Sequence, residues 1–168
     1  MSHLKEPIPI ILITGYLGAG KTTLLNHLLG LNSIRGQNPA LIINEFGTLG
    51  LDGNLVVPGD WTIFELNKGS LFCICLKTDF LQTLETIALK TKPGLLIIEA
   101  TGVAETRDLL AMVEEPALKD AFQVRGNICL VDALNFIKVA PMLKAAREQV
   151  IRADAVIINK CDLVPEEE

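Results

Sequence analysis

The sequence predicts an α/β fold, in which a doubly wound, mostly parallel sheet is covered by helices on both faces. Short apolar runs rich in β-branched residues alternate along the chain with segments of helical periodicity, and this alternation is typical of strand–helix–strand units. In addition, a glycine-rich turn joins the first apolar run to the first helical segment. A sheet of this kind binds ligands at the carboxyl ends of its strands, so functional residues are expected directly after the strands.

The apolar runs are expected to form strands that are buried on both faces of the sheet. They cover residues 8–14, 40–44, 94–100, 127–133 and 155–159, and residues 61–66 are expected to add a further strand. Helices are expected from the turn at Gly20 to a stop at Gly30, and over residues 78–90, 105–115 and 134–152, the last interrupted by Pro141. Within residues 78–90, one stripe of the helix carries Phe80, Leu81, Leu84, Ile87 and Ala88.

The composition fits one domain with a sizeable core, because 49% of the 168 residues are hydrophobic. The formal net charge of -5, with no cluster of Lys and Arg, argues against nucleic acid as a partner. The apolar run near the start, residues 10–13, is too short for a signal peptide or a membrane span. A cytoplasmic protein is therefore expected, whose four cysteines stay reduced.

Residues 15–22 read GYLGAGKT and match the phosphate-binding pattern G-x-x-x-x-G-K-[ST] between a strand and a helix. Glycines let the backbone curl so that N–H groups point at a phosphate, and the helix N-terminus adds partial positive charge. Lys21 is predicted to bridge the β- and γ-phosphates during catalysis, and the Thr22 hydroxyl to bind Mg²⁺. The alternative is a turn that binds nothing. The predicted nucleotide contacts here are Gly15, Gly18, Ala19, Gly20, Lys21, Thr22 and Thr23.

The segment LLIIEATG delivers Glu99 and then Gly102 from an apolar strand to the same edge of the sheet. Glu99 is predicted to hold Mg²⁺ through water or to orient the attacking water, and the Gly102 N–H to approach the γ-phosphate. The alternative is a carboxylate that caps the next helix.

Residues 159–162 read NKCD at the end of another apolar strand. The Asp162 carboxylate can accept both N1–H and N2–H₂ of guanine, whereas adenine presents an unprotonated N1 at that point. Asn159 is predicted to bond the other side of the base, and the stem of Lys160 to lie along the ring. The sequence therefore predicts GTP as the nucleotide and disfavours an ATP-dependent small-molecule kinase.

Taken together, these motifs resemble those of the CobW-like family of metallochaperone GTPases, whose wider group includes HypB, UreG and MeaB. The resemblance rests on GYLGAGKTTLLNHLL, on NEFG and GLDG, on EL with a cysteine motif, on IIEATG and on NKCD. It implies a SIMIBI-type GTPase domain over residues 1–168, the N-terminal fragment of a longer chain, with the family's C-terminal domain absent here. It also implies a GTP-dependent metallochaperone or metal insertase that carries zinc or cobalt.

The resemblance assigns a metal motif to the segment around Cys73 and Cys75, although the usual C-x-C-C pattern reads C-I-C-L here. In one register Leu76 replaces the third thiol; in a register anchored on Gly69, only Cys73 is retained. Two thiolates still suit Zn²⁺ or Co²⁺, and Glu45 of NEFG is expected to supply an oxygen ligand or to take part in catalysis.

The cysteine spacing alone also fits a redox pair, or a strand that packs its thiols in the core with Ile74 on the opposite face. Of the remaining cysteines, Cys129 is expected in the core, and Cys161 fills the variable position of NKCD. His27 is expected to be a surface or satisfied histidine rather than a ligand.

The implied mechanism couples metal affinity to nucleotide state, with GTP ordering the NEFG and cysteine segments and hydrolysis releasing the metal to a client. No catalytic glutamine or arginine finger stands out in the sequence, so slow hydrolysis is expected unless a client, a metal or a second subunit completes the site. The expected partners are GTP or GDP and a client metalloprotein or cofactor enzyme, with a homodimer left open. Two rival functions remain: a maturation GTPase that carries no metal, and a nucleotide-dependent regulatory binding module.

Overall fold

The computed structural model describes residues 6–44, 56–66, 74–100 and 106–165. Within these ranges six strands form one sheet in the order β3-β2-β4-β1-β5-β6, and every neighbouring pair is parallel. This confirms the parallel sheet that the apolar runs predict, including the strand expected at residues 61–66. The strands are β1 (Ile8–Gly15), β2 (Pro39–Asn44), β3 (Thr62–Leu66), β4 (Leu95–Glu99), β5 (Phe122–Asp132) and β6 (Ala155–Asn159).

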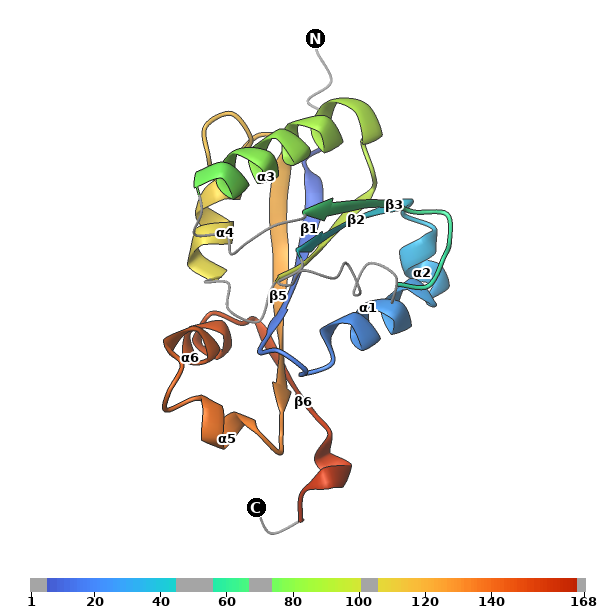
Figure 1. The fold of residues 1–168 in the computed structure, drawn as a ribbon. Coiled ribbons are helices and arrows are strands. Elements are labelled where there is room, and N and C mark those ends of the chain that lie inside the picture. The colour runs from blue at the N-terminus through green and yellow to red at the C-terminus, as the bar shows by residue number, and fades with distance from the viewer. Residues whose placement is uncertain (1–5, 45–55, 67–73, 101–105, 166–168) are drawn as a thin grey trace.

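Helices flank both faces of this sheet, as the doubly wound arrangement requires. In Figure 1, α1 and α2 lie on one side of the strands, and α3 and α4 on the other. None of the helices in the described ranges is long and apolar enough to cross a membrane. The helices are α1 (Lys21–Leu29), α2 (Asn32–Arg35), α3 (Ile74–Thr86), α4 (Thr106–Val113), α5 (Phe136–Val139) and α6 (Lys144–Ile151); a π-helical turn (Ile87–Thr91) extends α3, and a 3-10 turn (Cys161–Leu163) follows β6.

The core has two parts, one on each face of the sheet, and β1 contributes to both because successive strand residues point to opposite faces. Leu12 is buried among the side chains that face α3 and α4, whereas Ile13 is buried among those that face α1. Such a strand must be apolar along its whole length.

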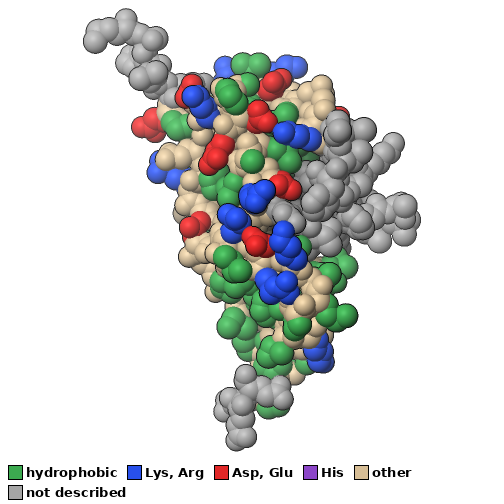
Figure 2. All heavy atoms as spheres, turned by 90° about the vertical axis from the view of Figure 1, so that its left-hand side faces the viewer, with side chains coloured by type: hydrophobic (Ala, Val, Ile, Leu, Met, Phe, Trp, Pro, Cys, Tyr) green, Lys and Arg blue, Asp and Glu red, His purple; other side chains and the backbone are tan. Residues whose placement is uncertain are grey.

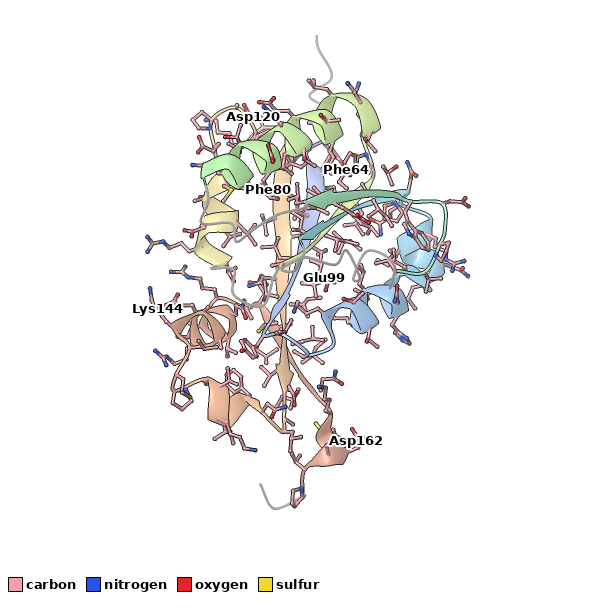
Figure 3. The ribbon with its side chains drawn as sticks, viewed as in Figure 1. Phe64, Phe80, Glu99, Asp120, Lys144 and Asp162 are labelled. Atoms are coloured by element: carbon pink, nitrogen blue, oxygen red, sulfur yellow. The ribbon has the colours of Figure 1, made fainter. Side chains whose placement is uncertain are left out.

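The apolar stripe of residues 78–90 is confirmed. Phe80, Leu84 and Ile87 are buried against the sheet, and Leu81 and Ala88 pack at the edge of the same cluster. Figure 3 shows Phe80 on α3, between the helix and the sheet.

The expected burial of residues 155–159 is wrong. β6 pairs only with β5, at the edge of the sheet, and Val156, Ile157 and Ile158 are 44%, 39% and 62% exposed. On another face, the left-hand side of Figure 1 where α4, α5 and α6 lie, Figure 2 shows hydrophobic side chains gathered toward the end of the molecule that carries the C-terminus, whereas acidic and basic groups mix over the rest. An apolar run thus predicts a strand correctly, but its burial depends on its place in the sheet.

The interruption of the helix expected at residues 134–152 is confirmed. α5 and α6 lie on either side of Pro141, because proline lacks the N–H that a continuous helix would use. The extended arrangement considered for the cysteine segment is wrong for Ile74 and Cys75, since α3 begins at Ile74. Cys73 lies outside the described residues.

Candidate functional site

The predicted phosphate turn lies between β1 and α1 and has the backbone conformation that its glycines allow. Gly15, Gly18 and Gly20 all have positive φ, at 137°, 75° and 101°. A Cβ on Gly15 would overlap the Leu130 carbonyl oxygen, and one on Gly20 would lie 2.5 Å from Asn159 Nδ2. The close approach of β5 to this turn therefore requires glycine at position 15, whereas at position 20 the positive φ favours glycine and a Cβ would displace the Asn159 side chain.

The charge of the turn is compatible with a bound anion. Lys21, the first residue of α1, is only 7% exposed, and its Nζ donates to the Tyr16 carbonyl at 3.4 Å. Because the amino end of a helix carries partial positive charge, the Lys21 ammonium and the start of α1 add to one another. A buried cation beside a helix N-terminus is suited to holding phosphate.

The β4 carboxylate lies beside the phosphate turn, at the shared edge of the sheet that the sequence predicts. Thr22 Oγ1 donates a hydrogen bond to Glu99 Oε1 at 2.7 Å. β4 runs parallel to β1 with Glu99 opposite Ile13, so the carboxylate emerges beside the start of α1. Glu99 is 6% exposed, and Figure 3 shows it near the centre of the molecule, where the strands end. A hydroxyl and a carboxylate in contact are the oxygen donors that Mg²⁺ prefers, so the pair fits that ion.

The NKCD segment reaches the same site from β6. Asn159 donates from Nδ2 to the Ala19 carbonyl at 2.8 Å, which ties the end of β6 to the phosphate turn. Lys160 has a positive φ of 62°, and the 3-10 turn follows it directly. Asp162, in that turn, is exposed and lies at the far end of β6 in Figure 3. The structure thus brings Asn159 to the phosphate turn and leaves the Asp162 carboxylate open to solvent.

Sequence reasoning missed Asp132, the last residue of β5. Its carboxylate lies 2.8 Å from Lys160 Nζ and accepts the Leu134 N–H and the Asn135 amide at 3.0 Å each, and the residue as a whole is 8% exposed. The hydrogen bond from Lys160 is the main cause that holds the pKa of Asp132 below its usual value, against the opposing effect of burial. An acidic residue at the end of an apolar strand was the available signal, the same signal that identified Glu99.

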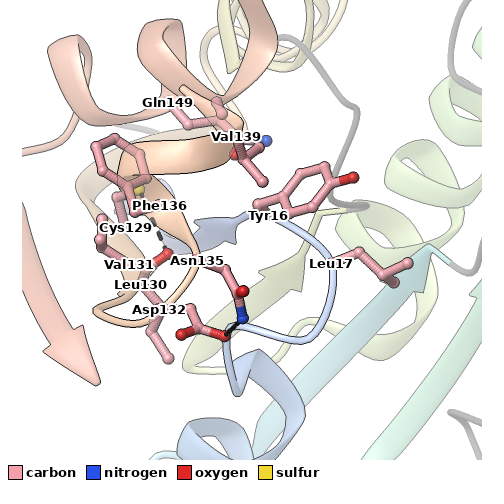
Figure 4. Close-up of a pocket in the computed structure, with 11 residues that line it drawn as sticks. Tyr16, Leu17, Cys129, Leu130, Val131, Asp132, Asn135, Phe136, Val139 and Gln149 are labelled. Atoms are coloured by element: carbon pink, nitrogen blue, oxygen red, sulfur yellow. Dashed lines mark hydrogen bonds between the residues drawn. The ribbon is translucent and has the colours of Figure 1, made fainter. Parts of the chain in front are cut away.

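A pocket of about 250 Å³ opens beside the phosphate turn. Figure 4 shows Tyr16 and Leu17 of that turn on one side and Phe136 and Val139 of α5 across from them. Cys129 lies in its wall and is 1% exposed, as the prediction of a core cysteine requires; burial raises the pKa of its thiol. The apolar side chains that line this pocket therefore form one wall beside the phosphate turn.

Several predicted residues lie outside the described part of the chain, namely Glu45, Cys73 and Gly102, while Cys75 lies in the first turn of α3. Among the side chains that the structure describes, no three His, Cys, Asp or Glu residues gather as metal ligands would. The assigned transition-metal ligands thus stay predictions. His27 is exposed on α1, as expected, and Cys161 is an exposed free thiol.

Comparison with known proteins agrees with the phosphate-binding geometry of this site. The family described as "CobW/HypB/UreG, nucleotide-binding domain" matches residues 9–168. The zinc chaperone YjiA of Escherichia coli (strain K12) is 34% identical over 97% of this chain and 52% of its own length. The zinc chaperone CobW of Pseudomonas aeruginosa is 30% identical over 92% of this chain and 49% of its own length.

A solved structure gives the same result for the fold. The crystal structure of Zn(II)-bound YjiA GTPase from E. coli superposes with a TM-score of 0.67 at 27% identity, over 96% of this chain and 52% of that chain. The chain therefore spans about half the length of the relatives that it matches.

Proposed function

The chain belongs to the CobW/HypB/UreG family of nucleotide-binding domains, and from that membership we propose that it is a GTP-hydrolysing metallochaperone or metal insertase. In this proposal nucleotide state controls the delivery of a transition metal, zinc or cobalt, to a client protein. The observation that carries the nucleotide part is the meeting of three sequence motifs at one edge of the sheet, through Thr22 with Glu99 and Asn159 with Ala19.

The phosphates are assigned to the turn between β1 and α1. Backbone N–H groups from Gly15 to Thr23 would surround the β-phosphate, and Lys21 would neutralise the developing charge on the transferred group. When bound, Mg²⁺ would supply further charge neutralisation, held by Thr22 and by Glu99. Glu99 would otherwise orient the attacking water, as would Glu45, and Gly102 would approach the γ-phosphate.

The base is assigned to the NKCD segment. Asp162 would accept the two adjacent N–H donors of guanine, Lys160 would lie along the ring, and Asn159 would support the opposite side. The contact between Asn159 and Ala19 supports this proposal, because it links the base-binding segment to the phosphate turn by a hydrogen bond of 2.8 Å.

The metal is assigned to Cys73 and Cys75, with Glu45 as an oxygen ligand. The names of the relatives support zinc as the cargo: two of them are zinc chaperones. The proposal includes a cytoplasmic location, a client metalloprotein or cofactor enzyme, and no role for nucleic acid. Leu76 in place of a third thiol favours one alternative, a maturation GTPase that gates a cofactor without carrying metal.

The nucleotide part is tested by phosphate release from GTP and from ATP, with Mg²⁺ and with or without Zn²⁺. Slow hydrolysis of GTP in preference to ATP is expected, and Lys21→Ala should abolish it. Lys90→Ala is the control, because Lys90 is exposed and precedes the amino end of β4, whereas Glu99 lies at its carboxyl end. Equal use of ATP, or activity that survives Lys21→Ala, would contradict the proposal.

A further inference from the structure

The carboxylate of Asp132 is held by groups that leave it little freedom. Its Oδ1 accepts the Leu134 backbone N–H at 3.0 Å, two residues further along the chain, which forms a local turn. Its Oδ2 accepts the Asn135 amide at 3.0 Å and the Lys160 ammonium at 2.8 Å. The orientation of the carboxylate is thus set by β5 and the segment after it, independently of Lys160.

Lys160, by contrast, belongs to the base-binding segment and gains its direction from Asp132. Its side chain is 34% exposed, whereas that of Asp132 is 10% exposed. Parallel pairing sets Asp132 opposite Asn159, the residue immediately before Lys160. With Nζ fixed on the carboxylate, the four-carbon stem of Lys160 must run between its own backbone and the end of β5.

The segment is therefore fixed at two consecutive side chains. Asn159 is fixed to the phosphate turn by its bond to Ala19, and Lys160 is fixed to β5 by its bond to Asp132. Asp162 follows two residues later and is exposed. The effect of Asp132 on a bound base would thus pass through Lys160.

A purely stabilising ion pair explains this arrangement less well. Ion pairs with an exposed partner add little to stability, because water screens them and the lysine loses side-chain freedom. The Asp132 carboxylate already has two other donors, Leu134 and Asn135. These two donors already hold the carboxylate in place. Its further bond to Lys160, in the base-binding segment, therefore needs another explanation.

We propose that Asp132 is a positioning residue for guanine recognition, which holds Lys160 so that its stem forms one wall of the base site. The inference rests on the proposed function, since it assumes that NKCD binds guanine. It predicts that loss of the Asp132 charge weakens binding of guanine nucleotides, and leaves the weak binding of adenine nucleotides, which depends on the phosphate turn, unchanged.

The experiment titrates fluorescent derivatives of GDP and ADP, with Mg²⁺, into the full chain and into Asp132→Asn. The variant keeps the size of the side chain and removes its charge. We expect GDP affinity to fall about tenfold or more, as for loss of a charge-assisted hydrogen bond, with ADP affinity within about twofold of the parent. A purely structural role would lower both affinities together.

A matched control and a second variant complete the test. Asp154 accepts the Asn127 N–H at 2.8 Å and lies at the opposite end of the same β5–β6 pair, so Asp154→Asn should leave the ratio of GDP to ADP affinity unchanged. Lys160→Met keeps the stem and removes the ammonium. If Asp132 acts through Lys160, adding Asp132→Asn to Lys160→Met causes no further loss of GDP affinity.

The outcomes separate this inference from the function on which it rests. If the parent chain does not prefer GDP to ADP, the assignment of guanine to NKCD is wrong. If the parent prefers GDP and Asp132→Asn keeps that preference in full, the proposed role of Asp132 is wrong while GTP binding stands. An equal loss of both nucleotides, or losses that add in the double variant, would also overturn the role of Asp132.

Discussion

Thr22 Oγ1 donates a hydrogen bond of 2.7 Å to Glu99 Oε1, although 77 residues separate the two in the chain. Parallel pairing of β1 with β4 places Glu99 opposite Ile13, close to the residues that lead into α1. The two side chains assigned to Mg²⁺ are therefore in direct hydrogen-bond contact. Substitution of either residue is therefore expected to weaken Mg²⁺ binding more than it weakens phosphate binding.

Thr22→Ala is expected to remove the magnesium-dependent part of nucleotide affinity. Binding of GDP with Mg²⁺ should weaken about tenfold or more, and addition of EDTA should then change it little further. Isothermal titration with and without Mg²⁺ checks this. Thr22→Ser keeps the hydroxyl and should behave like the parent chain; if Thr22→Ala still responds to Mg²⁺ as the parent does, Thr22 is not a ligand.

Glu99→Gln is expected to slow GTP hydrolysis more than it weakens GTP binding. The amide keeps the shape of the carboxylate but neither attracts a cation nor accepts a proton from water. A loss of about a hundredfold in kcat is expected, as for other residues that position or deprotonate the attacking group, with KM changed by a few fold. Steady-state phosphate release provides both constants, and an unchanged kcat would remove Glu99 from the catalytic assignment.

Gly15→Ala is expected to destabilise the fold more than Gly18→Ala. Both positions have positive φ, which costs a residue with a Cβ about 1–3 kcal/mol. Only at Gly15 would the Cβ also overlap the Leu130 carbonyl, whereas nothing lies within 4 Å of a Cβ on Gly18. Overlap of this kind adds about 1–3 kcal/mol, so urea unfolding without nucleotide should separate the two variants. Equal stabilities would contradict the close approach of β5 to the turn.

The buried thiol of Cys129 is expected to make stability fall at alkaline pH. Burial raises its pKa in the folded state, so unfolding lets the thiol ionise at its ordinary pKa near 8.5. The contribution is fully present below that pH and is lost as pH rises through the raised folded pKa. The free energy of unfolding of Cys129→Ala should therefore decline less than that of the parent between about pH 8 and 10. Parallel curves would contradict it.

The strands could be predicted from sequence because each is a short apolar run, and the phosphate turn because its glycines occur in a fixed pattern. Burial of β6 could not, since Val156 and Ile158 carry no sign of an edge position. Whether a strand has one neighbour or two depends on sheet order, which is set by long-range pairing. The helical start at Ile74 was missed because C-I-C-L alternates as a strand does.

Within the site, the motif residues were named from the sequence, whereas Asp132 was passed over although it ends an apolar strand, as Glu99 does. Asp132 belongs to no pattern quoted from the sequence, and its relation to Lys160 arises only when β5 and β6 pair. Glu99 was singled out from this strand-end signal, in a segment, LLIIEATG, that also carries Gly102. The sequence indicates which residues could act, whereas the pairing of strands decides which of them meet.

The central claim, that nucleotide state controls metal binding, is tested most directly by a Zn²⁺ competition titration against a chromophoric chelator. The reduced chain is loaded with Mg²⁺ and either GDP or a non-hydrolysable GTP analogue. The double variant Cys73→Ser/Cys75→Ser is titrated in the same way. Cys161→Ser is the control, because the Cys161 thiol is exposed in the 3-10 turn. We expect Zn²⁺ affinity to be about tenfold or more higher with the GTP analogue, to be lost in the double variant and to be unchanged in Cys161→Ser. Zn²⁺ affinity that is the same with both nucleotides, or that survives loss of Cys73 and Cys75, would contradict the account.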